Sequence, residues 1–392
     1  MYHMRKRLGI VFLIIAALIS GCDSVPQETG TETATGRTNS NAEEAVPNTG
    51  GAAPNADGAT LNAGGAAPNA DGATLNAGGA APNADGATPS AEEAASNEEG
   101  KSSKATFKDV TGTEISVDLP VEKIACLTEI CVDALVELGL KPSAVTAGGL
   151  APEPEFYGEE AASLGIIGGS FFEPNLEDIS LAGPDLVIGL EGTHEGLREG
   201  LAGIAPLYIV QPRSMQESIE FLQHMGQLTG RVTEAEAAEK RLLDKFNYYK
   251  EHSPKDKTAL VMYGSDVNFG IDTAGSLVGS VLAEVTQYPW PAPEADGGHQ
   301  AGGMAYSLEK VLENDPDYIF VETFTFSPDS QPLSEQFKTN PLWSRLRAVK
   351  NGQVHEMRTS VWASGRGTRS LGIILDEAMS HMYPELYKKA VE

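Results

Sequence analysis

Two sets of short apolar runs, separated by a long helical stretch, limit the fold of this chain more than any other feature. The first set lies between residues 123 and 210, and the second lies between residues 259 and 357. Apolar runs that alternate with helical patterns are typical of parallel strands connected by crossover helices. The predicted strands are residues 123–127, 144–147, 185–190, 207–210, 259–263, 318–322 and 353–357. The sequence therefore predicts two α/β units in one chain.

The stretch between the two sets predicts a long helix. Ser214 with Glu217, and Thr233 with Glu236, have the spacing of capping boxes at helix starts. After Thr233, apolar residues recur at helical spacing as far as about Lys250. These residues are Ala235, Ala238, Leu242, Phe246 and Tyr249. At 1.5 Å per residue, the stripe predicts an uninterrupted helix roughly 25–28 Å long.

Both ends of the folded part add a further element. A strand pair is expected at residues 106–110 and 114–117, because the turn residues Thr111 and Gly112 lie between them. The closing helix has one apolar face, which indicates packing in the core. That face consists of Leu371, Ile374, Leu375, Ala378, Met379 and Met382.

The first 22 residues have the pattern of an export signal. A basic front at residues 5–7 precedes an apolar run at residues 8–19, which is shorter than the ~20 residues that span a membrane. The tetrapeptide at residues 19–22 resembles the bacterial lipobox, in which Cys22 becomes the lipidated first residue. Two acyl chains, palmitate among them, anchor a protein stably at ~0.8 kcal/mol per buried CH₂. We expect a lipid anchor at the outer face of the cytoplasmic membrane; the alternative is ordinary secretion.

A repetitive segment follows the signal. Residues 51–64 are repeated identically at 65–78, and a third copy begins at 79. The repeat is too poor in large apolar residues to stack as a solenoid. Its composition, which extends over residues 23–103, predicts a disordered tether with a reach on the order of 50 Å. The tether is either a spacer or a repeat expansion without a selected length.

Charge and cysteine content exclude several classes of protein. The formal net charge is −27, and no basic block follows residue 7, so nucleic-acid binding is not expected. Three cysteines in 392 residues do not make a disulfide scaffold. The only long apolar run lies in the export signal, which excludes a polytopic membrane protein.

The order of several short motifs resembles that of helical-backbone (class III) substrate-binding lipoproteins, which serve ABC importers of ferric siderophores, haem and cobalamin. The resemblance covers about residues 104–390. It is carried by residues 123–127, 138–140, 175–177 and 183–188 in the first half, and by residues 307–309, 315–319, 346–354 and Trp362 in the second. It implies two Rossmann-like lobes joined by one stiff helix, with the ligand between them, in a monomer. We divide the chain into an N-terminal lobe (104–212), a helical segment (213–257) and a C-terminal lobe (258–392).

Motifs of the common enzyme classes are absent from the sequence. It contains neither a GxxxxGK[ST] phosphate loop nor a GxSxG nucleophile elbow. His194 and Glu195 begin an HExxH pattern, but position 198 is Arg198. We therefore expect no catalytic residues, no metal site of the protein's own and no intrinsic cofactor; Fe³⁺ would arrive only as part of a bound siderophore. Haem remains an alternative, because Tyr, Met or His can ligate its iron.

Ligands of open α/β sheets bind beyond the carboxyl ends of the strands, and this rule selects candidate residues. Aromatic walls and an arginine suit a bulky, oxygen-rich chelate, since guanidinium offers a fork of donors. We expect Trp362 to form a wall and Arg366 to contact an anion, although Trp362 could instead be a core residue and Arg369 a surface ion pair. Of two adjacent phenylalanines, only one would face the cleft. The candidate set is Thr128, Glu129, Phe172, Tyr263, Trp290, Trp362, Arg366 and Arg369.

Two further pairs of residues stand out. Glu177 and Glu309 occur in matching contexts in the two halves, and in the family such glutamates dock onto permease arginines. The alternative is that each is simply an acidic residue favoured near a helix N-terminus.

Cys126 and Cys131 lie five positions apart, where a disulfide is conceivable, but we favour two buried free thiols.

The leading hypothesis is an extracytoplasmic lipoprotein that captures a ferric siderophore and delivers it to an ABC permease. A cobalamin- or haem-binding protein of the same class is the first alternative. An extracytoplasmic hydrolase or a structural surface protein are alternatives from other classes.

Overall fold

The computed structural model describes residues 103–267, 269–292, 303–325 and 331–391. The export signal with Cys22 and the repetitive tether lie outside the described residues. Among the described residues, none of the helices combines the length and apolar character needed to cross a bilayer.

The first lobe is built on a parallel sheet of five strands, in the order β5-β4-β3-β6-β7. Its inner strands are buried because they consist of apolar residues that helices cover. The strands are β3 (Ile124–Cys126), β4 (Ala144–Thr146), β5 (Gly165–Ile167), β6 (Leu186–Leu190) and β7 (Leu207–Val210). The helices are α1 (Glu129–Glu137), α2 (Leu176–Ala182) and α3 (Arg198–Leu201).

A hairpin precedes this sheet, as predicted. β1 (Ser103–Lys108) pairs antiparallel with β2 (Glu114–Leu119). The Asp109 carboxylate holds the turn, accepting the backbone N–H groups of Thr111 at 3.0 Å and Thr113 at 3.1 Å.

The second lobe has a mixed sheet of five strands, in the order β10-β9-β8-β11-β12. The three strands β8, β11 and β12 are parallel, and β9 is antiparallel to both of its neighbours. The strands are β8 (Ala259–Gly264), β9 (Gly270–Asp272), β10 (Gly303–Ala305), β11 (Tyr318–Thr323) and β12 (Val354–Met357). The helices are α6 (Leu277–Ala283), α7 (Leu308–Asn314), α8 (Leu333–Gln336) and α9 (Arg347–Lys350). The two predicted α/β units with mostly parallel sheets are confirmed.

The same corner occurs once in each lobe. A seven-residue helix ends in a residue with left-handed backbone, Gly183 after α2 and Asp315 after α7, and a Pro-Asp pair follows. Asp185 accepts the backbone N–H of Lys123 at 2.8 Å, and Asp317 accepts that of Thr258 at 2.9 Å. Each carboxylate thus ties the start of one strand to the start of its parallel neighbour.

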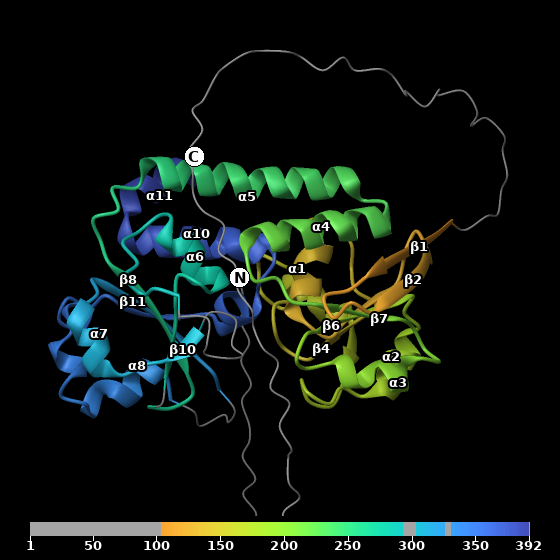
Figure 1. Ribbon diagram of the computed structural model, residues 1–392, viewed down its shortest axis with the longest axis horizontal. Coiled ribbons are helices and arrows are strands. Elements are labelled where there is room, and N and C mark those ends of the chain that lie inside the picture. Colours follow the sequence, from red (N-terminus) through yellow and green to blue (C-terminus); the bar gives the residue numbers. More distant parts are fainter. Residues whose placement is uncertain (1–102, 268, 293–302, 326–330, 392) are drawn as a thin grey trace, which may run out of the picture. The chain divides into compact units, whose positions relative to one another are not determined.

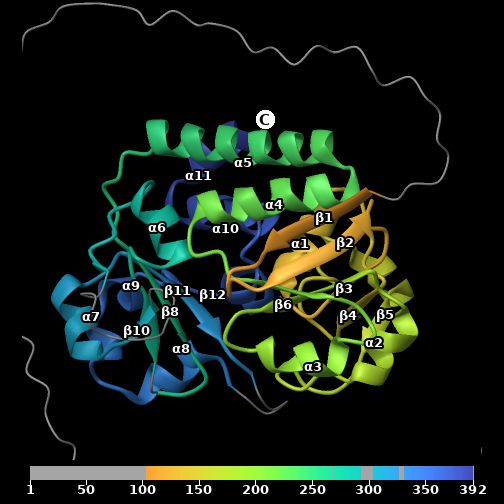
Figure 2. The same cartoon turned by 45° about the vertical axis from the view of Figure 1, so that its right-hand side comes forward.

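Two consecutive helices, α4 (Met215–Thr229) and α5 (Val232–His252), connect the lobes. Ser214 caps α4, as predicted, by accepting the N–H of Glu217 at 3.2 Å. The second predicted capping box is wrong, because α5 already begins at Val232 and Thr233 lies inside its first turn. The five apolar residues predicted for α5 are all buried. Figures 1 and 2 both show α5 running beside α4 on the same side of both lobes.

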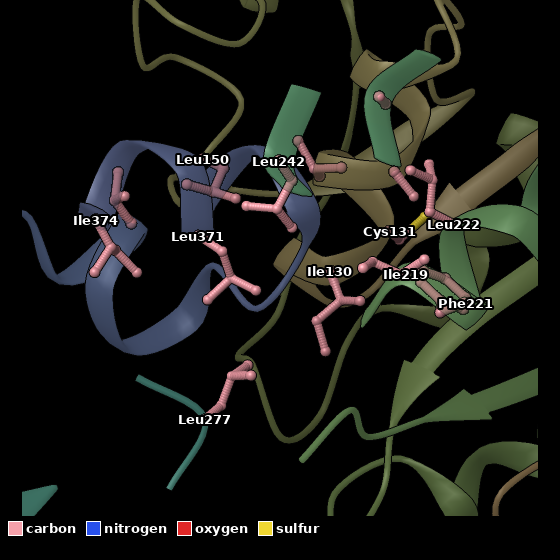
Figure 3. Close-up of a cluster of buried hydrophobic side chains, with 14 of the residues drawn as sticks. Ile130, Cys131, Leu150, Ile219, Phe221, Leu222, Leu242, Leu277, Leu371 and Ile374 are labelled. Atoms are coloured by element: carbon pink, nitrogen blue, oxygen red, sulfur yellow. The ribbon is translucent and has the colours of Figure 1, made fainter. Parts of the chain in front are cut away.

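One hydrophobic core is shared by the two lobes. It contains Ile130 of α1, Leu242 of α5, Leu277 of α6 and Leu371 of α10 (Thr368–Met382), which point toward a common interior in Figure 3. The predicted apolar face of α10 is fully buried there. The last helix, α11 (Pro384–Val391), packs on α10 and α5. Separate smaller cores fill the other face of each sheet.

The N-terminus of α10 is capped from the first lobe. The buried Asp133 of α1 accepts the backbone N–H groups of Arg369 at 3.0 Å and Ser370 at 2.8 Å, together with the Ser370 hydroxyl at 2.5 Å. A side chain at Gly367 would collide with this carboxylate, since its Cβ would lie 2.1 Å from Asp133 Oδ1. Burial raises the pKa of Asp133 to about 6, although the Ser370 and Arg369 hydrogen bonds oppose the shift.

Cys126 and Cys131 form a disulfide, so the prediction of free thiols is wrong. The tight turn from β3 into α1 brings their Cα atoms to 5.5 Å, a usual separation for a disulfide. The bond fixes the strand–helix junction that carries Thr128 and Glu129.

Candidate functional site

Two adjoining cavities lie at the carboxyl ends of the strands, as predicted. Each has a volume of about 580 Å³. Cavity A is lined mainly from the second lobe, by residues such as Tyr263, Asp272, Glu322 and Phe324. Cavity B is lined mainly from the first lobe, by residues that include Thr128, Glu129, Gly149 and Phe171. Both touch Leu190, Ala363, Ser364 and Arg366, and together they form the cleft.

Glu129 forms part of the first-lobe wall. It begins α1, and its carboxylate accepts the backbone N–H of Leu150 at 2.7 Å. Gly149, with φ +66°, permits this approach, because a Cβ there would lie 1.8 Å from Glu129 Oε1. Burial raises the pKa of Glu129 to about 7, against the Leu150 hydrogen bond, which lowers it. Thr128, also predicted, lies beside Glu129 in cavity B.

The prediction of Phe172 as a cleft residue is wrong, and its neighbour Phe171 takes the place. The carbonyl of Phe171 lies 2.7 Å from Nε2 of the buried His194, and the two rings meet edge to face at 5.2 Å. This anchoring directs Phe171 into cavity B and leaves Phe172 with 68% of its surface exposed. Burial lowers the pKa of His194, so the ring is neutral at pH 7.

Aromatic side chains form the second-lobe wall. Tyr263 of β8 and Phe324, which follows β11, line cavity A with ring centroids 6.2 Å apart. The Tyr263 ring passes over Gly270, where any side chain would clash with it. Burial raises the pKa of Tyr263 to about 12, so its hydroxyl is neutral and able to donate a hydrogen bond. The prediction that Tyr263 faces the site agrees with this position.

Two carboxyl groups, Asp272 at the end of β9 and Glu322 on β11, face cavity A. Glu322 is 2% exposed, and its Oε1 has no hydrogen-bond partner among the described residues. Burial raises the pKa of Asp272 to about 6 and raises that of Glu322 well above its usual range. Neither residue is predicted as a site residue from the sequence. The available signal is that Glu322 is the one acid inside the apolar run 318–322.

The segment between β12 and α10 brings Trp362 and Arg366 to the cleft. Trp362 lies in a π-helical turn (Ser360–Ser364) and lines cavity A, although only 1% of it is exposed. Its Nε1 donates to Glu377 Oε2 at 2.6 Å, and its ring packs against Phe320. Trp362 is therefore both a core residue and part of the wall.

Arg366 lies where the two cavities meet. The hydroxyl of Ser218 donates a hydrogen bond to the backbone carbonyl oxygen of Arg366 at 2.7 Å. Among the described residues its guanidinium makes no salt bridge at contact distance, and its positive charge acts on the nearby Asp272 and Glu322, where it lowers the pKa of each against the larger effect of burial. It is therefore available to a ligand from both cavities.

Two predicted residues lie away from the cleft. Trp290 is 1% exposed in the core of the second lobe, where its Nε1 donates to the Ala259 carbonyl at 2.7 Å. The prolines on both sides of Trp290 suggest a loop at the rim of the cleft. Burial of the indole is more favourable, because the apolar core also offers a hydrogen-bond acceptor for its N–H group. Arg369 donates to the Glu155 carbonyl at 2.9 Å and pairs with Glu137, which confirms the surface ion pair as the better reading.

Glu177 and Glu309 occupy equivalent places in the two lobes. Each is the exposed second residue of a seven-residue helix, α2 or α7, directly before the repeated Pro-Asp corner. Asn175 and Ser307 cap these helices through side-chain oxygens. Whether the two glutamates dock to a permease stays a prediction.

No group of three or more His, Cys, Asp or Glu side chains within the described ranges is placed to hold a metal ion.

Comparison with known proteins identifies the family that has this architecture. The periplasmic binding protein family matches residues 124–361, more than half of the chain. The Fe(3+)-citrate-binding protein YfmC of Bacillus subtilis is 28% identical over 223 residues, which are 55% of this chain and 66% of YfmC, just under two thirds. The probable siderophore-binding lipoprotein YfiY of Bacillus subtilis is 26% identical over 288 residues, 70% of this chain and 87% of YfiY.

A solved structure has the same fold. The triscatecholate siderophore-binding protein FeuA of Bacillus subtilis, complexed with ferri-bacillibactin, superposes with a TM-score of 0.57 at 22% identity, covering 71% of this chain and 98% of FeuA. The two lobes, the connecting helices and the family match agree with one another. This chain belongs to the periplasmic binding protein family.

Proposed function

We propose that this protein captures a ferric siderophore in the cleft and delivers it, chemically unchanged, to an ABC permease. The observation that carries the proposal is the guanidinium of Arg366, which makes no salt bridge at contact distance among the described residues and faces both cavities beside the aromatic wall of Tyr263 and Phe324. An iron chelate presents oxygens to such a group and apolar arms to such a wall.

The size of the cleft supports this class of ligand. Each cavity has a volume of about 580 Å³, within the range of roughly 300–1,000 Å³ for small-molecule sites. Members of the family are binding proteins, and the named relatives bind Fe(3+)-citrate or siderophores. Iron would accordingly enter with its chelate.

The setting of the protein is part of the same proposal. Cys22 would carry the lipid anchor on the outer face of the membrane, as the lipoprotein relative suggests. Glu177 and Glu309, exposed at equivalent helix starts, would present one negative charge from each lobe of the monomer to the permease.

Quenching of tryptophan fluorescence tests the proposal directly, because Trp362 lines cavity A. The mature chain is titrated with ferric hydroxamate, catecholate and citrate chelates, with haem and cobalamin as comparisons. We expect saturable one-to-one quenching by at least one ferric chelate, and a loss of about 10- to 100-fold in affinity for Arg366→Ala, the size expected for a charged hydrogen bond.

Arg231→Ala provides the matched control, since Arg231 pairs with Glu234 at the exposed start of α5. It should bind as the unaltered chain does. Saturation by cobalamin or haem with no response to any ferric chelate would refute the proposal.

A further inference from the structure

Cavity A is lined by more acidic than basic side chains. Asp272 and Glu322 both line it, and Arg366 is the single basic residue among its lining residues. The Ser276 hydroxyl, which donates to the Thr273 carbonyl at 3.0 Å, also lies near the Asp272 carboxylate and lowers its pKa against the larger effect of burial. The hydroxyl of Tyr288, which also lies near, donates to the backbone carbonyl of Asp272 at 2.9 Å and not to its carboxylate.

Glu322 is the more unusual of the two acids. It lies on β11, the strand between β8 and β12, and 2% of it is exposed. Its Oε1 is buried without a hydrogen-bond partner among the described residues. An unpaired buried acceptor destabilises a folded protein, so a group that serves only the fold would be expected to have a partner. The Glu322 side chain lines cavity A, so a rotation of its carboxyl group would present the unpaired oxygen to a ligand there.

We propose that the chelate bound by this protein carries a cationic ammonium group, which binds between Asp272 and Glu322 while Arg366 contacts an oxygen of the metal-chelating core. This inference rests on the proposed function and adds the charge of the substrate to it. An ammonium group supplies up to three N–H donors, enough for the unpaired Oε1 and for the neighbouring carboxylate. The cleft would thus disfavour chelates whose peripheral groups are all anionic.

The protonation of the two acids agrees with this assignment. The ionisable groups that face them are Arg366, Tyr263 and Tyr288, and burial raises the pKa of both tyrosines, which leaves them neutral. Burial also raises the pKa of Glu322, and the negative charge of Asp272 raises it further. When both carboxyl groups are ionised, the pair has one more negative charge than Arg366 balances, and a bound ammonium group would compensate that charge and favour the ionised form.

A pair of chelates that differ only at the amine tests the proposal. Ferric desferrioxamine B carries a pendant ammonium on a neutral trihydroxamate core, and its N-acetyl derivative has the same core without the charge. The mature chain is titrated with both, and with ferric citrate, by fluorescence and calorimetry. We expect the amine form to bind about 10- to 100-fold more tightly than the acetylated form, the value of one charge-assisted hydrogen bond.

Glu322→Gln should remove most of that preference, while Glu313→Gln, at an exposed position on α7, should retain it. Thermal unfolding establishes that each variant is folded, and Asp272→Asn replaces Glu322→Gln if the latter does not fold. Equal affinities for the two trihydroxamates, or tightest binding of ferric citrate, would overturn this inference and leave the proposed function standing. Failure of every ferric chelate to bind would overturn both.

Discussion

Replacing Asp133 by alanine tests whether a residue of the first lobe secures the helix that closes the second. The carboxylate accepts three hydrogen bonds at the N-terminus of α10, from two backbone N–H groups and one hydroxyl. Gly367, the N-cap residue, offers no side chain to replace it. Asp133→Ala would leave these donors without an acceptor in a site closed to water.

The magnitude follows from two opposing contributions. Each buried donor left unpaired costs about 1–3 kcal/mol, whereas removing the buried carboxylate relieves its cost of desolvation. The pKa of Asp133, about 6 against an ordinary 3.8, sets a lower bound of about 3 kcal/mol for that cost above pH 6, because the hydrogen bonds to Arg369 and Ser370 offset part of it. We therefore expect Asp133→Ala to lower the free energy of unfolding by about 2–3 kcal/mol at pH 8.

The pH dependence sharpens this prediction. A carboxyl group whose pKa is raised by folding stabilises the folded state below its unfolded pKa, and that stabilisation is lost as the pH rises through the folded pKa. The unaltered chain therefore gains stability from Asp133 on going from pH 8 to pH 5, and Asp133→Ala does not. The loss caused by the substitution should be about 1–2 kcal/mol larger at pH 5.

Urea unfolding at the two pH values measures both quantities, and Asp133→Asn serves as the matched control. Asparagine keeps the volume and one acceptor oxygen, so it should lose less than half as much as alanine at pH 8. Amide hydrogen exchange at Arg369 and Ser370 should accelerate in Asp133→Ala alone. Unchanged unfolding midpoints together with unchanged exchange at these two amides would show that Asp133 does not cap α10.

Three further outcomes follow from the site. Because burial raises the pKa of Glu129 to about 7, its contribution to stability is present below about pH 4 and is lost as the pH rises through 7. Glu129→Gln should therefore make the urea unfolding midpoint depend less on pH between pH 5 and pH 8. An unchanged pH dependence of that midpoint would contradict the assignment. Reducing the disulfide between Cys126 and Cys131 removes a short-loop constraint worth about 2 kcal/mol and should lower the unfolding temperature. Calorimetric unfolding with and without dithiothreitol measures this change, and equal transitions would refute it. Gly149→Ala should displace the Glu129 carboxylate and weaken chelate binding about tenfold in a fluorescence titration. Gly139→Ala, at a similar φ but with open space around it, should not weaken binding. Equal affinities of the two variants would exclude the close approach of Gly149 to Glu129 as a determinant of binding.

The parts of the fold that the sequence predicts are those with long apolar patterns. The five buried residues of α5 and the apolar face of α10 follow from helical spacing alone. The strands β5, β9 and β10 do not, because each has three residues and begins with glycine, too few for an apolar run to be distinguished. The Pro-Asp corners explain why short motifs predict this fold, since each Asp binds the backbone of a neighbouring strand.

The site is predicted less completely than the fold. Strand ends direct attention to Thr128, Glu129, Tyr263 and Arg366, because the carboxyl ends of parallel strands meet at one edge. The rule does not say which way a side chain turns after the strand ends. The choice between Phe171 and Phe172 depends on His194, which is 22 or more positions away, and the burial of Trp290 depends on an acceptor on β8.

The core shared by α1, α5, α6 and α10 restricts how far the two lobes can separate. Swinging the lobes wide apart would strip Leu242, Leu277 and Leu371 of their neighbours and bring water into the interior. We therefore expect the cleft to open by a small tilt of the lobes or by rearrangement of loops at its rim, rather than by a wide separation of the lobes. Under the proposed function, a permease would therefore have to act at the rim of the cleft to release the ligand.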